Sequence, residues 1–217
     1  MPEAADVSIW ELYWGQFLIG GAFMLISMII GARLKGKFAK YSKTQISSNL
    51  SGKEIAEKML VDHGIHDVQI TCTQGRLTDH YNPKNKTVNL SEDVYHGRNA
   101  AAAAVASHEV GHAVQHATKY NMLEFRSAMV PLQNISGAIM NLIVMVAFLG
   151  GSFLYQTLPM TEILIVIIAA QTVITLFALV TLPVEFDASK RALAWIKDSG
   201  VVTSQEHGMS KDALKWA

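Results

Sequence analysis

Three long stretches without a charged side chain constrain the fold of this 217-residue chain more than any other feature. They are Leu12–Ile30, Ser127–Thr161 (most apolar over Met129–Gly150) and Ile163–Leu182. A helix rises about 1.5 Å per residue, so about twenty residues cross a hydrocarbon core of roughly 30 Å. Charged residues make up only 17% of the chain, against roughly 25% in soluble domains. We therefore predict a mainly α-helical integral membrane protein with three transmembrane helices.

The first stretch is typical of an anchor helix rather than of a cleaved signal sequence. A signal sequence carries its positive charge before its apolar core, and here the order is reversed. The acidic residues Glu3, Asp6 and Glu11 precede the stretch, and the basic residues Arg33, Lys35, Lys37 and Lys40 follow it. We therefore predict that residues 1–33 form an uncleaved N-terminal anchor.

Positive charges are confined to two parts of the chain. All eighteen Lys and Arg residues lie within Arg33–Arg126 and Lys190–Lys215. Loops rich in Lys and Arg stay in the cytoplasm, and this bias sets the orientation of membrane proteins. We therefore expect both of these parts on the cytoplasmic side of the membrane and the N-terminus on the outer side.

This orientation divides the chain into an anchor and three further parts. Residues 34–126 form a cytoplasmic region, residues 127–182 two transmembrane helices, and residues 183–217 a second cytoplasmic segment. The formal net charge is zero, so we expect no nucleic-acid partner. The single cysteine, Cys72, excludes an internal disulfide framework and fits a reducing compartment.

The region between the first two spans has the helix-capping and strand signals of a small α+β unit. Ser51, with Glu54 three residues later, predicts a capping box that opens a short helix. β-Branched residues in Val68–Cys72 and Thr87–Leu90 predict two short strands. Asn99–Tyr120 contains no proline and begins with a run of alanines, so we predict a longer helix there.

This longer helix carries the segment His108-Glu109-Val110-Gly111-His112. Residues four apart lie on one helical face about 6 Å apart along the axis, so both imidazoles can reach one cation. In zinc peptidases with this pattern, the metal activates a water molecule and the glutamate acts as general base. We therefore expect His108 and His112 to bind Zn²⁺ and Glu109 to be the catalytic base. Gly111 costs about 1 kcal/mol in a helix interior, which indicates that another element packs closely against it.

A catalytic zinc ion needs a third protein ligand and one open position. His116 lies about 12 Å along the axis from the first histidine, too far for one metal on a straight helix, so we assign it to the surroundings. Glu185 is the better candidate because it follows Leu182-Pro183 at the cytoplasmic end of the third span. Ser189, one turn later, could hydrogen-bond a ligand, and Asp187 could orient one histidine.

With these residues in hand, the chain resembles the YugP-type neutral zinc metallopeptidases, a bacterial membrane family. The motifs that carry the resemblance are DHYNP at Asp79–Pro83, VNLSEDVY at Val88–Tyr95, SHEVGHAVQH at Ser107–His116 and LPVEFDAS at Leu182–Ser189. The resemblance implies a multi-pass protein of the bacterial plasma (inner) membrane with a cytoplasmic zincin-like unit, distantly similar to HtpX and the CAAX prenyl endopeptidases. It implies a gluzincin-like site, with the metal ligands His108, His112 and Glu185 and the base Glu109.

The chain departs from that pattern in two places. The broader class with a glutamate ligand usually has Asp four residues after it, where this chain has Ser189. Members of the resembled family usually continue into one more hydrophobic helix, and these 217 residues contain no fourth such stretch.

Two features of the active site follow from the similarity to zincins in general. An edge strand before the metal helix binds the substrate backbone by strand addition, and we assign this role to Thr87–Leu90. A hydrogen-bond donor should also face the oxyanion of the transition state. The nearby candidates, which the sequence does not distinguish, are His80, Tyr81, Tyr120 and Arg126.

Two other functions remain as alternatives. An intramembrane protease also uses a His-Glu-x-x-His helix, but polar residues such as Arg98 and Lys119 flank the motif here. A membrane scaffold with a structural zinc would have no need of Glu109. We therefore predict a zinc-dependent endopeptidase that cleaves membrane or membrane-proximal proteins. Its expected partners are a protein or peptide substrate and the lipid bilayer, with a homo-oligomer or a membrane partner left open.

Overall fold

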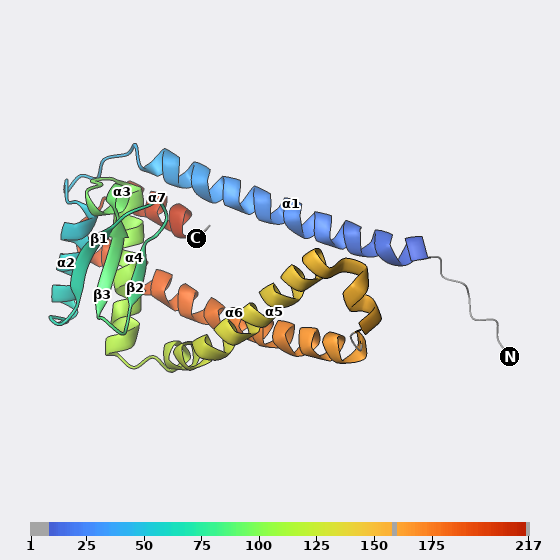
Figure 1. Cartoon of the computed structure of the whole chain (residues 1–217). Helices are drawn as coiled ribbons and strands as arrows, with labels where there is room; N and C mark the ends of the chain where they lie inside the picture. The colour runs from blue at the N-terminus through green and yellow to red at the C-terminus, as the bar shows by residue number, and fades with distance from the viewer. Residues whose placement is uncertain (1–8, 158–159, 216–217) are drawn as a thin grey trace.

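Three helices in the computed structural model are long and apolar enough to cross a membrane, by length and composition. They are α1 (Ile9–Tyr41), α5 (Asn121–Thr157) and α6 (Met160–Asp198), and each contains the most apolar part of one uncharged stretch. The structure describes residues 9–157 and 160–215, so most of the N-terminal segment predicted to face outward lies outside it. α5 and α6 form a helical hairpin, and α1 extends in the same direction from the rest of the molecule (Figure 1). The prediction of three apolar helices is confirmed.

Two of these helices run past the boundaries predicted for them. α1 continues beyond residue 33 to Tyr41, and α6 passes through Pro183 without interruption. A proline inside a helix removes one backbone hydrogen bond, which made Pro183 look like the end of the span. Membrane helices tolerate proline because neighbouring helices and local adjustments satisfy the freed backbone groups. Glu185 is therefore carried by the same helix that begins at Met160.

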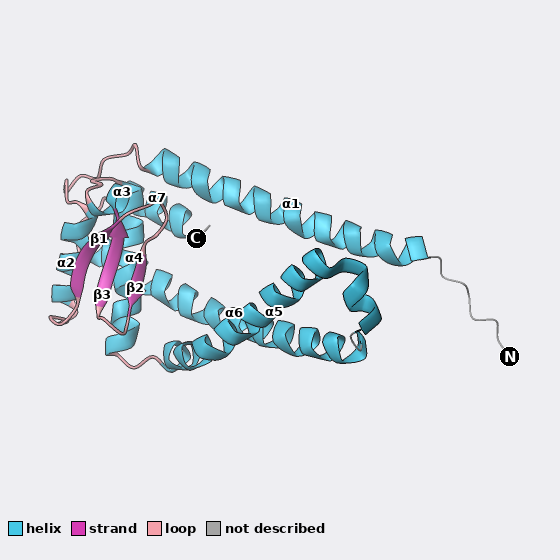
Figure 2. Ribbon diagram, in the orientation of Figure 1, coloured by secondary structure: helices cyan, strands magenta, loops and turns pink. Residues whose placement is uncertain are grey.

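The remaining elements form a small α+β unit at one end of the molecule (Figures 1 and 2). In chain order they are α2 (Gly52–Asp62), β1 (Gln69–Thr73), β2 (His80–Asn82), β3 (Thr87–Ser91), α3 (Glu92–Tyr95), α4 (Ala100–Ala117) and α7 (Ser204–Leu214). The capping box predicted for α2 is present, with both the side chain of Ser51 and that of Glu54 bonded to backbone N–H groups. The predicted α+β character of this region is confirmed.

The three-stranded sheet corrects one expectation about substrate binding. Its order is β1-β3-β2, with β1 parallel and β2 antiparallel to β3. Thr87–Leu90 therefore lies in the central strand and has no free edge for a substrate. The unpredicted strand β2 is the reason: it has only three residues, and the turn after Asn82 folds it back onto β3.

Helix α4 lies at the centre of this unit, between two groups of elements. α2 and the sheet pack on one side, and α6 and α7 pack on the other. The alanine run at its start is almost completely buried, which lets the neighbouring elements approach closely. On the facing side of α6, the buried residues are Val184, Ala188, Ala192 and Ile196, spaced four apart. α4 and the last part of α6 are therefore held in a fixed register.

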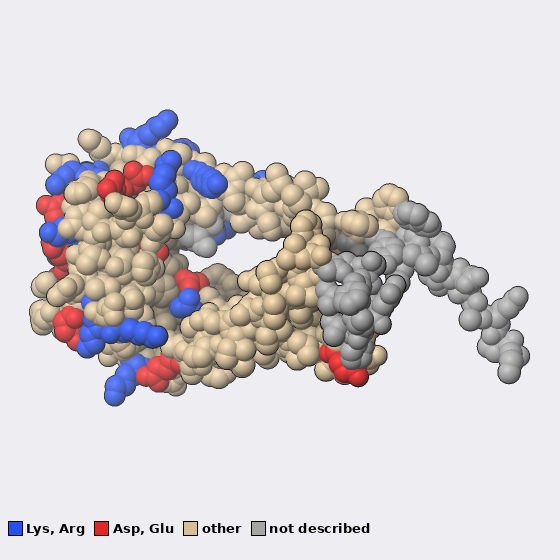
Figure 3. Space-filling model, viewed as in Figure 1, with Lys and Arg blue, Asp and Glu red and all other residues tan. Residues whose placement is uncertain are grey.

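The C-terminal end of α1 is joined to the unit through α7. Lys37 Nζ lies 2.5 Å from Asp212 Oδ2, and the hydroxyl of Tyr41 donates to the same carboxylate. Lys and Arg side chains gather at this end of the molecule, whereas the shafts of the three long helices carry few of them (Figure 3). The charged unit thus adjoins the ends of helices whose exposed side chains are largely apolar, such as Phe17 and Phe148.

Candidate metal centre

Helices α4 and α6 bring three potential metal donors together. Glu185 Oε2 lies 3.2 Å from His108 Nε2 and 3.2 Å from His112 Nε2. The two imidazole rings stand at 86° to each other, with their centroids 4.8 Å apart. One donor atom from each of the three residues lies within 4.8 Å of the others. The structure therefore places the three residues expected to be ligands around one point.

This donor set fits a zinc ion. Zinc binds imidazole nitrogens and carboxylate oxygens at about 2.0–2.2 Å, so two donors in a tetrahedron lie about 3.3–3.6 Å apart. The observed separations of 3.2 Å from the carboxylate to each imidazole are close to this value. Two neutral imidazoles and one carboxylate also leave the fourth position for water, as in catalytic zinc sites.

The close approach of the two helices depends on Gly111. A Cβ atom added at this position would lie 2.6 Å from the backbone oxygen of Ala188. Real Cβ atoms are not found so close to backbone, so a larger residue would push α6 away. The expectation that Gly111 allows another element to pack near the metal site is confirmed, and that element is the helix that carries Glu185.

The second ring nitrogen of His108 and of His112, Nδ1, also lies within hydrogen-bond distance of a side chain. Ser189 Oγ lies 3.0 Å from His108 Nδ1, which is the contact expected from its place one turn after Glu185. Gln115 Oε1 lies 3.0 Å from His112 Nδ1. When both Nε2 atoms face a metal, both Nδ1–H groups donate, and a fixed acceptor sets the tautomer and the ring orientation. Ser189 and Gln115 can each serve as that acceptor.

Gln115 links His112 on α4 to the backbone of α6. Its side chain is completely buried, and its Nε2 donates to Val184 O at 2.8 Å and to Asp187 Oδ2 at 2.9 Å. Asp187 accepts a second hydrogen bond from Arg191 Nε, so its link to His112 runs through Gln115. Sequence reasoning missed Gln115 because its role appears only when α6 packs against this face of α4.

Glu109 lies beside the donors and is buried, with 8% of its surface exposed. Burial raises the pKa of its carboxyl group, although the two neighbouring histidines act in the opposite direction. Burial also opposes protonation of His112, but Glu185 and Glu109 outweigh it and raise the pKa of this imidazole. The carboxylates therefore favour a positive charge between the histidines.

The other histidine and tyrosine residues that the sequence suggested for the site make contacts of their own. His116 Nδ1 is hydrogen-bonded to the Tyr81 hydroxyl at 2.8 Å, in keeping with its assignment to the surroundings. His80 Nδ1 lies 2.8 Å from Thr78 O, and Tyr120 packs under the guanidinium group of Arg191. The hydroxyl of Tyr81 and one ring nitrogen of His80 therefore already have other partners, and the ring of Tyr120 lies against Arg191.

Arg126 is different because it reaches the predicted metal ligand. Its Nη2 lies 3.9 Å from Glu185 Oε1, and its guanidinium group stacks over the ring of Phe177 at 5.9 Å. Its Nε is buried without a hydrogen-bond partner in the structure. The structure thus brings one of the four candidates next to the site.

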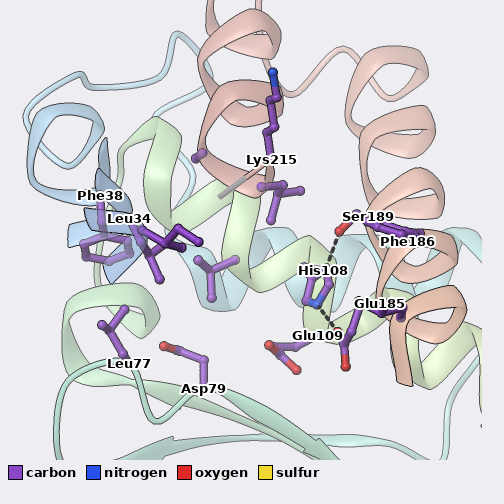
Figure 4. Close-up of a pocket in the computed structure, with 15 residues that line it drawn as sticks. Leu34, Phe38, Leu77, Asp79, His108, Glu109, Glu185, Phe186, Ser189 and Lys215 are labelled. Atoms are coloured by element: carbon purple, nitrogen blue, oxygen red, sulfur yellow. Dashed lines mark hydrogen bonds and ion pairs between the residues drawn. The ribbon is translucent and has the colours of Figure 1, made fainter. Parts of the chain in front are cut away.

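A cavity of about 500 Å³ lies beside the donors (Figure 4). His108, Glu109 and Glu185 line it, and Figure 4 shows their side chains converging on one side of it. The rest of its wall comes from α1, α6, α7 and the segment that precedes β2. A ligand in this cavity would therefore contact the two ligand-bearing helices and α1 at the same time.

Comparisons with known proteins agree with this chemistry. A family model described as "Putative neutral zinc metallopeptidase" matches residues 16–217, a range that includes all three donors. The "Putative membrane protease YugP" of Bacillus subtilis (strain 168) is 41% identical over 180 residues, which are 82% of this chain and 76% of that relative. No solved structure gives a significant match.

Proposed function

The chain belongs to the family described as "Putative neutral zinc metallopeptidase", and from that premise we propose that it is a membrane-embedded zinc endopeptidase. The observation that carries the proposal is the convergence of His108, His112 and Glu185 beside Glu109. The three donors come from two helices, and one of these is long and apolar enough to cross a membrane. The relative that is described as a membrane protease supports the same setting.

Each residue has a defined part in this proposal. His108, His112 and Glu185 would hold the zinc, and a zinc ion bound there would lower the pKa of a water molecule and polarise the scissile carbonyl. Glu109 takes the proton of the attacking water and transfers it to the nitrogen of the leaving amine. Burial beside two histidines suits this role, because the raised pKa makes the carboxylate a stronger base.

Two further assignments concern the surroundings of the reaction. Arg126 is the candidate best placed to stabilise negative charge on the carbonyl oxygen, because its guanidinium group reaches Glu185 and has an unused N–H. β2 (His80–Asn82) is an edge strand next to α4, so it offers backbone groups for an extended peptide.

The proposed reaction takes place on the cytoplasmic side of a bacterial plasma membrane. The α+β unit and the end of α6 carry all the Lys and Arg residues apart from those at the ends of the long helices, as expected for parts that stay inside. The helix of the His-Glu-x-x-His motif is not one of the three candidate spans. This favours cleavage at the membrane boundary over cleavage within the bilayer.

The variant Glu109→Gln tests the peptidase proposal against a scaffold with a structural zinc. Protein purified in detergent should bind zinc as wild type does, because glutamine leaves the three ligands in place. Cleavage of a quenched-fluorescent peptide library should fall on the order of 10²–10⁴-fold, the usual contribution of a general base. If the variant cleaved peptides as fast as wild type, Glu109 would be excluded as the base. A wild-type protein that binds zinc but cleaves no peptide would favour the scaffold.

A further inference from the structure

Most side chains that line the cavity beside the donors are apolar, and five of these come from the candidate membrane helices α1 and α6. Ile30, Leu34 and Phe38 lie four residues apart on α1, so they form one stripe along the helix. Leu182 and Phe186 face the cavity from α6, on either side of Glu185. Ile30 and Phe186 remain 45% and 70% exposed. This apolar surface gains free energy when a ligand covers it.

Apart from the proposed base Glu109, the charged groups in the cavity wall are already engaged or turned away. Asp79 accepts hydrogen bonds from the backbone N–H and the hydroxyl of Ser91. Glu185 faces the two histidines, and the ammonium group of Lys215 points away from the donors (Figure 4). A charged side chain that entered this cavity would lose its water, and Glu109, the one carboxylate in the wall without a hydrogen bond among the described residues, lies beside the donors, where the reaction needs it.

We propose that this cavity binds a bulky apolar side chain of the substrate next to the scissile bond, an inference that rests on the proposed peptidase function. A substrate must place its carbonyl group at the three donors, and the cavity opens beside them. Since α1 and α6 form its walls at the ends of their apolar stretches, the preferred substrate is an apolar peptide segment at the membrane surface. Leu34 on α1 is then a specificity-determining residue.

Two hydroxamates of different chain length test this inference without requiring catalysis. Both chelate zinc through the same group, but 4-methylpentanohydroxamate adds a branched apolar chain that acetohydroxamate lacks. Each buried methylene contributes roughly fourfold to affinity, so the longer compound should bind the zinc-loaded full chain at least about tenfold more tightly. Calorimetric titration in one detergent measures both affinities.

The variant Leu34→Glu places a carboxylate in the apolar stripe and should reduce the difference between the hydroxamates to less than about threefold. Gly36→Glu is the matched control: it adds the same charge two residues away, where a side chain meets no neighbour, and should keep the full difference. The variants keep the three donors, so each should still bind zinc. A preference that persists in Leu34→Glu would overturn the inference, since it would come from the detergent or from another surface.

Peptide cleavage provides a second measurement of the same preference. Among quenched-fluorescent peptides that differ at one residue beside the scissile bond, those with Leu should be cleaved at least tenfold faster than those with Lys or Asp. A preference for Lys would overturn the inference, because it would show that the carboxylates in the cavity wall select the substrate. Equal binding of the two hydroxamates by the zinc-loaded protein would overturn this inference alone. A chain that binds neither zinc nor hydroxamate would contradict the peptidase proposal as well.

Discussion

The two halves of α6 belong to one helix but have opposite surroundings. Before Pro183 its large side chains are mostly exposed, as for Ile165 and Ile168, which is the pattern of a helix that faces lipid. After Pro183, buried residues recur every four positions from Val184 to Ile196 and pack against α4 and its neighbours. The difference shows that one continuous helix serves both as a candidate membrane span and as the carrier of the third donor.

This continuity has a consequence for the metal centre. Glu185 lies on a helix whose first half has mostly exposed apolar side chains and whose second half packs against α4 and its neighbours. The carboxylate is therefore held at the junction of the two halves without any loop between them. Sites on regular elements are positioned more precisely than sites on loops, so substitutions in the two halves should have very different effects on zinc binding.

The largest expected effect comes from removing the carboxylate of Glu185, in the second half of α6. Glu185→Ala removes one of three ligands and should weaken zinc binding more than about hundredfold, because loss of a residue that merely orients a ligand already costs about 10–100-fold. Glu162→Ala, in the first turn of α6, removes the same group from an exposed position and should leave the affinity unchanged. Competition with a fluorescent zinc chelator measures both. If Glu185→Ala bound zinc as tightly as Glu162→Ala and wild type, Glu185 would not be a ligand.

A smaller effect on zinc affinity is expected from Gln115, which lies on α4 and contacts the second half of α6. Gln115→Met keeps the volume but removes the acceptor for His112 and the hydrogen bonds to Val184 and Asp187. Zinc affinity should fall about 10–100-fold. The control Gln171→Met changes an exposed glutamine in the membrane half and should have no effect on it. The visible absorption of the Co²⁺-substituted protein should change in Gln115→Met, because the orientation of His112 changes.

Two glycine substitutions compare the close contact of α4 with α6 at Gly111 with a position on α5 where a side chain meets no neighbour. Gly111→Ala introduces a Cβ at 2.6 Å from Ala188 O, and overpacking of this kind destabilises a protein by about 1–3 kcal/mol. Gly137→Ala on α5 meets no neighbour and should be neutral or gain up to about 1 kcal/mol in helix propensity. Thermal unfolding in detergent measures the two variants. A Gly111→Ala protein as stable as wild type would contradict the close packing of α4 on α6.

The smallest expected effect concerns the acid sensitivity of the α+β unit. Hydrogen bonds from Ser51, and to a lesser extent Arg98, hold the pKa of Glu54 below its usual value. A lowered pKa in the folded state means that the stabilisation is present above the unfolded pKa and is lost as the pH falls through the folded one. The amides of α2 should therefore exchange faster with solvent as the pH is lowered from 6 to about 3, after correction for intrinsic exchange rates.

Ser51→Ala provides the control for this pH dependence. It removes the hydroxyl that caps α2 and should cost about 1 kcal/mol. The acid sensitivity of α2 should be smaller in this variant, while exchange in the shaft of α6 should be the same in both proteins. An α2 helix with the same pH dependence in both proteins would show that the hydroxyl of Ser51 does not couple to the titration of Glu54, which would leave the backbone N–H of Ser51 as the coupling group.

The sequence was most informative where a pattern is local. Uncharged stretches of about twenty residues predicted the three long helices, and the spacing of Ser51 and Glu54 predicted the start of α2. The four-residue spacing of His108 and His112 predicted two donors on one face of a helix. Each of these patterns depends on contacts within one element, so the sequence alone contains the necessary information.

Features that depend on packing between distant elements could not be predicted. β2 has three residues and no distinctive composition, so the sequence did not predict it. The central position of β3 in the sheet could therefore not be predicted either. The role of Gln115 depends on α6, which lies about seventy residues later in the chain. The contribution of α1 to the cavity arises for the same reason, because Leu34 meets the site only in three dimensions.

X-ray absorption at the zinc edge of the detergent-purified full chain tests the central claim most directly. With one zinc per chain bound by His108, His112 and Glu185, the spectrum should show two imidazoles and two oxygens at about 2.0–2.2 Å, the second oxygen being water. A sulfur ligand at about 2.3 Å would contradict the account, because it would place the metal at Cys72. A spectrum without imidazole, or one that stays the same in Glu185→Ala, would show that α4 and α6 do not share the metal.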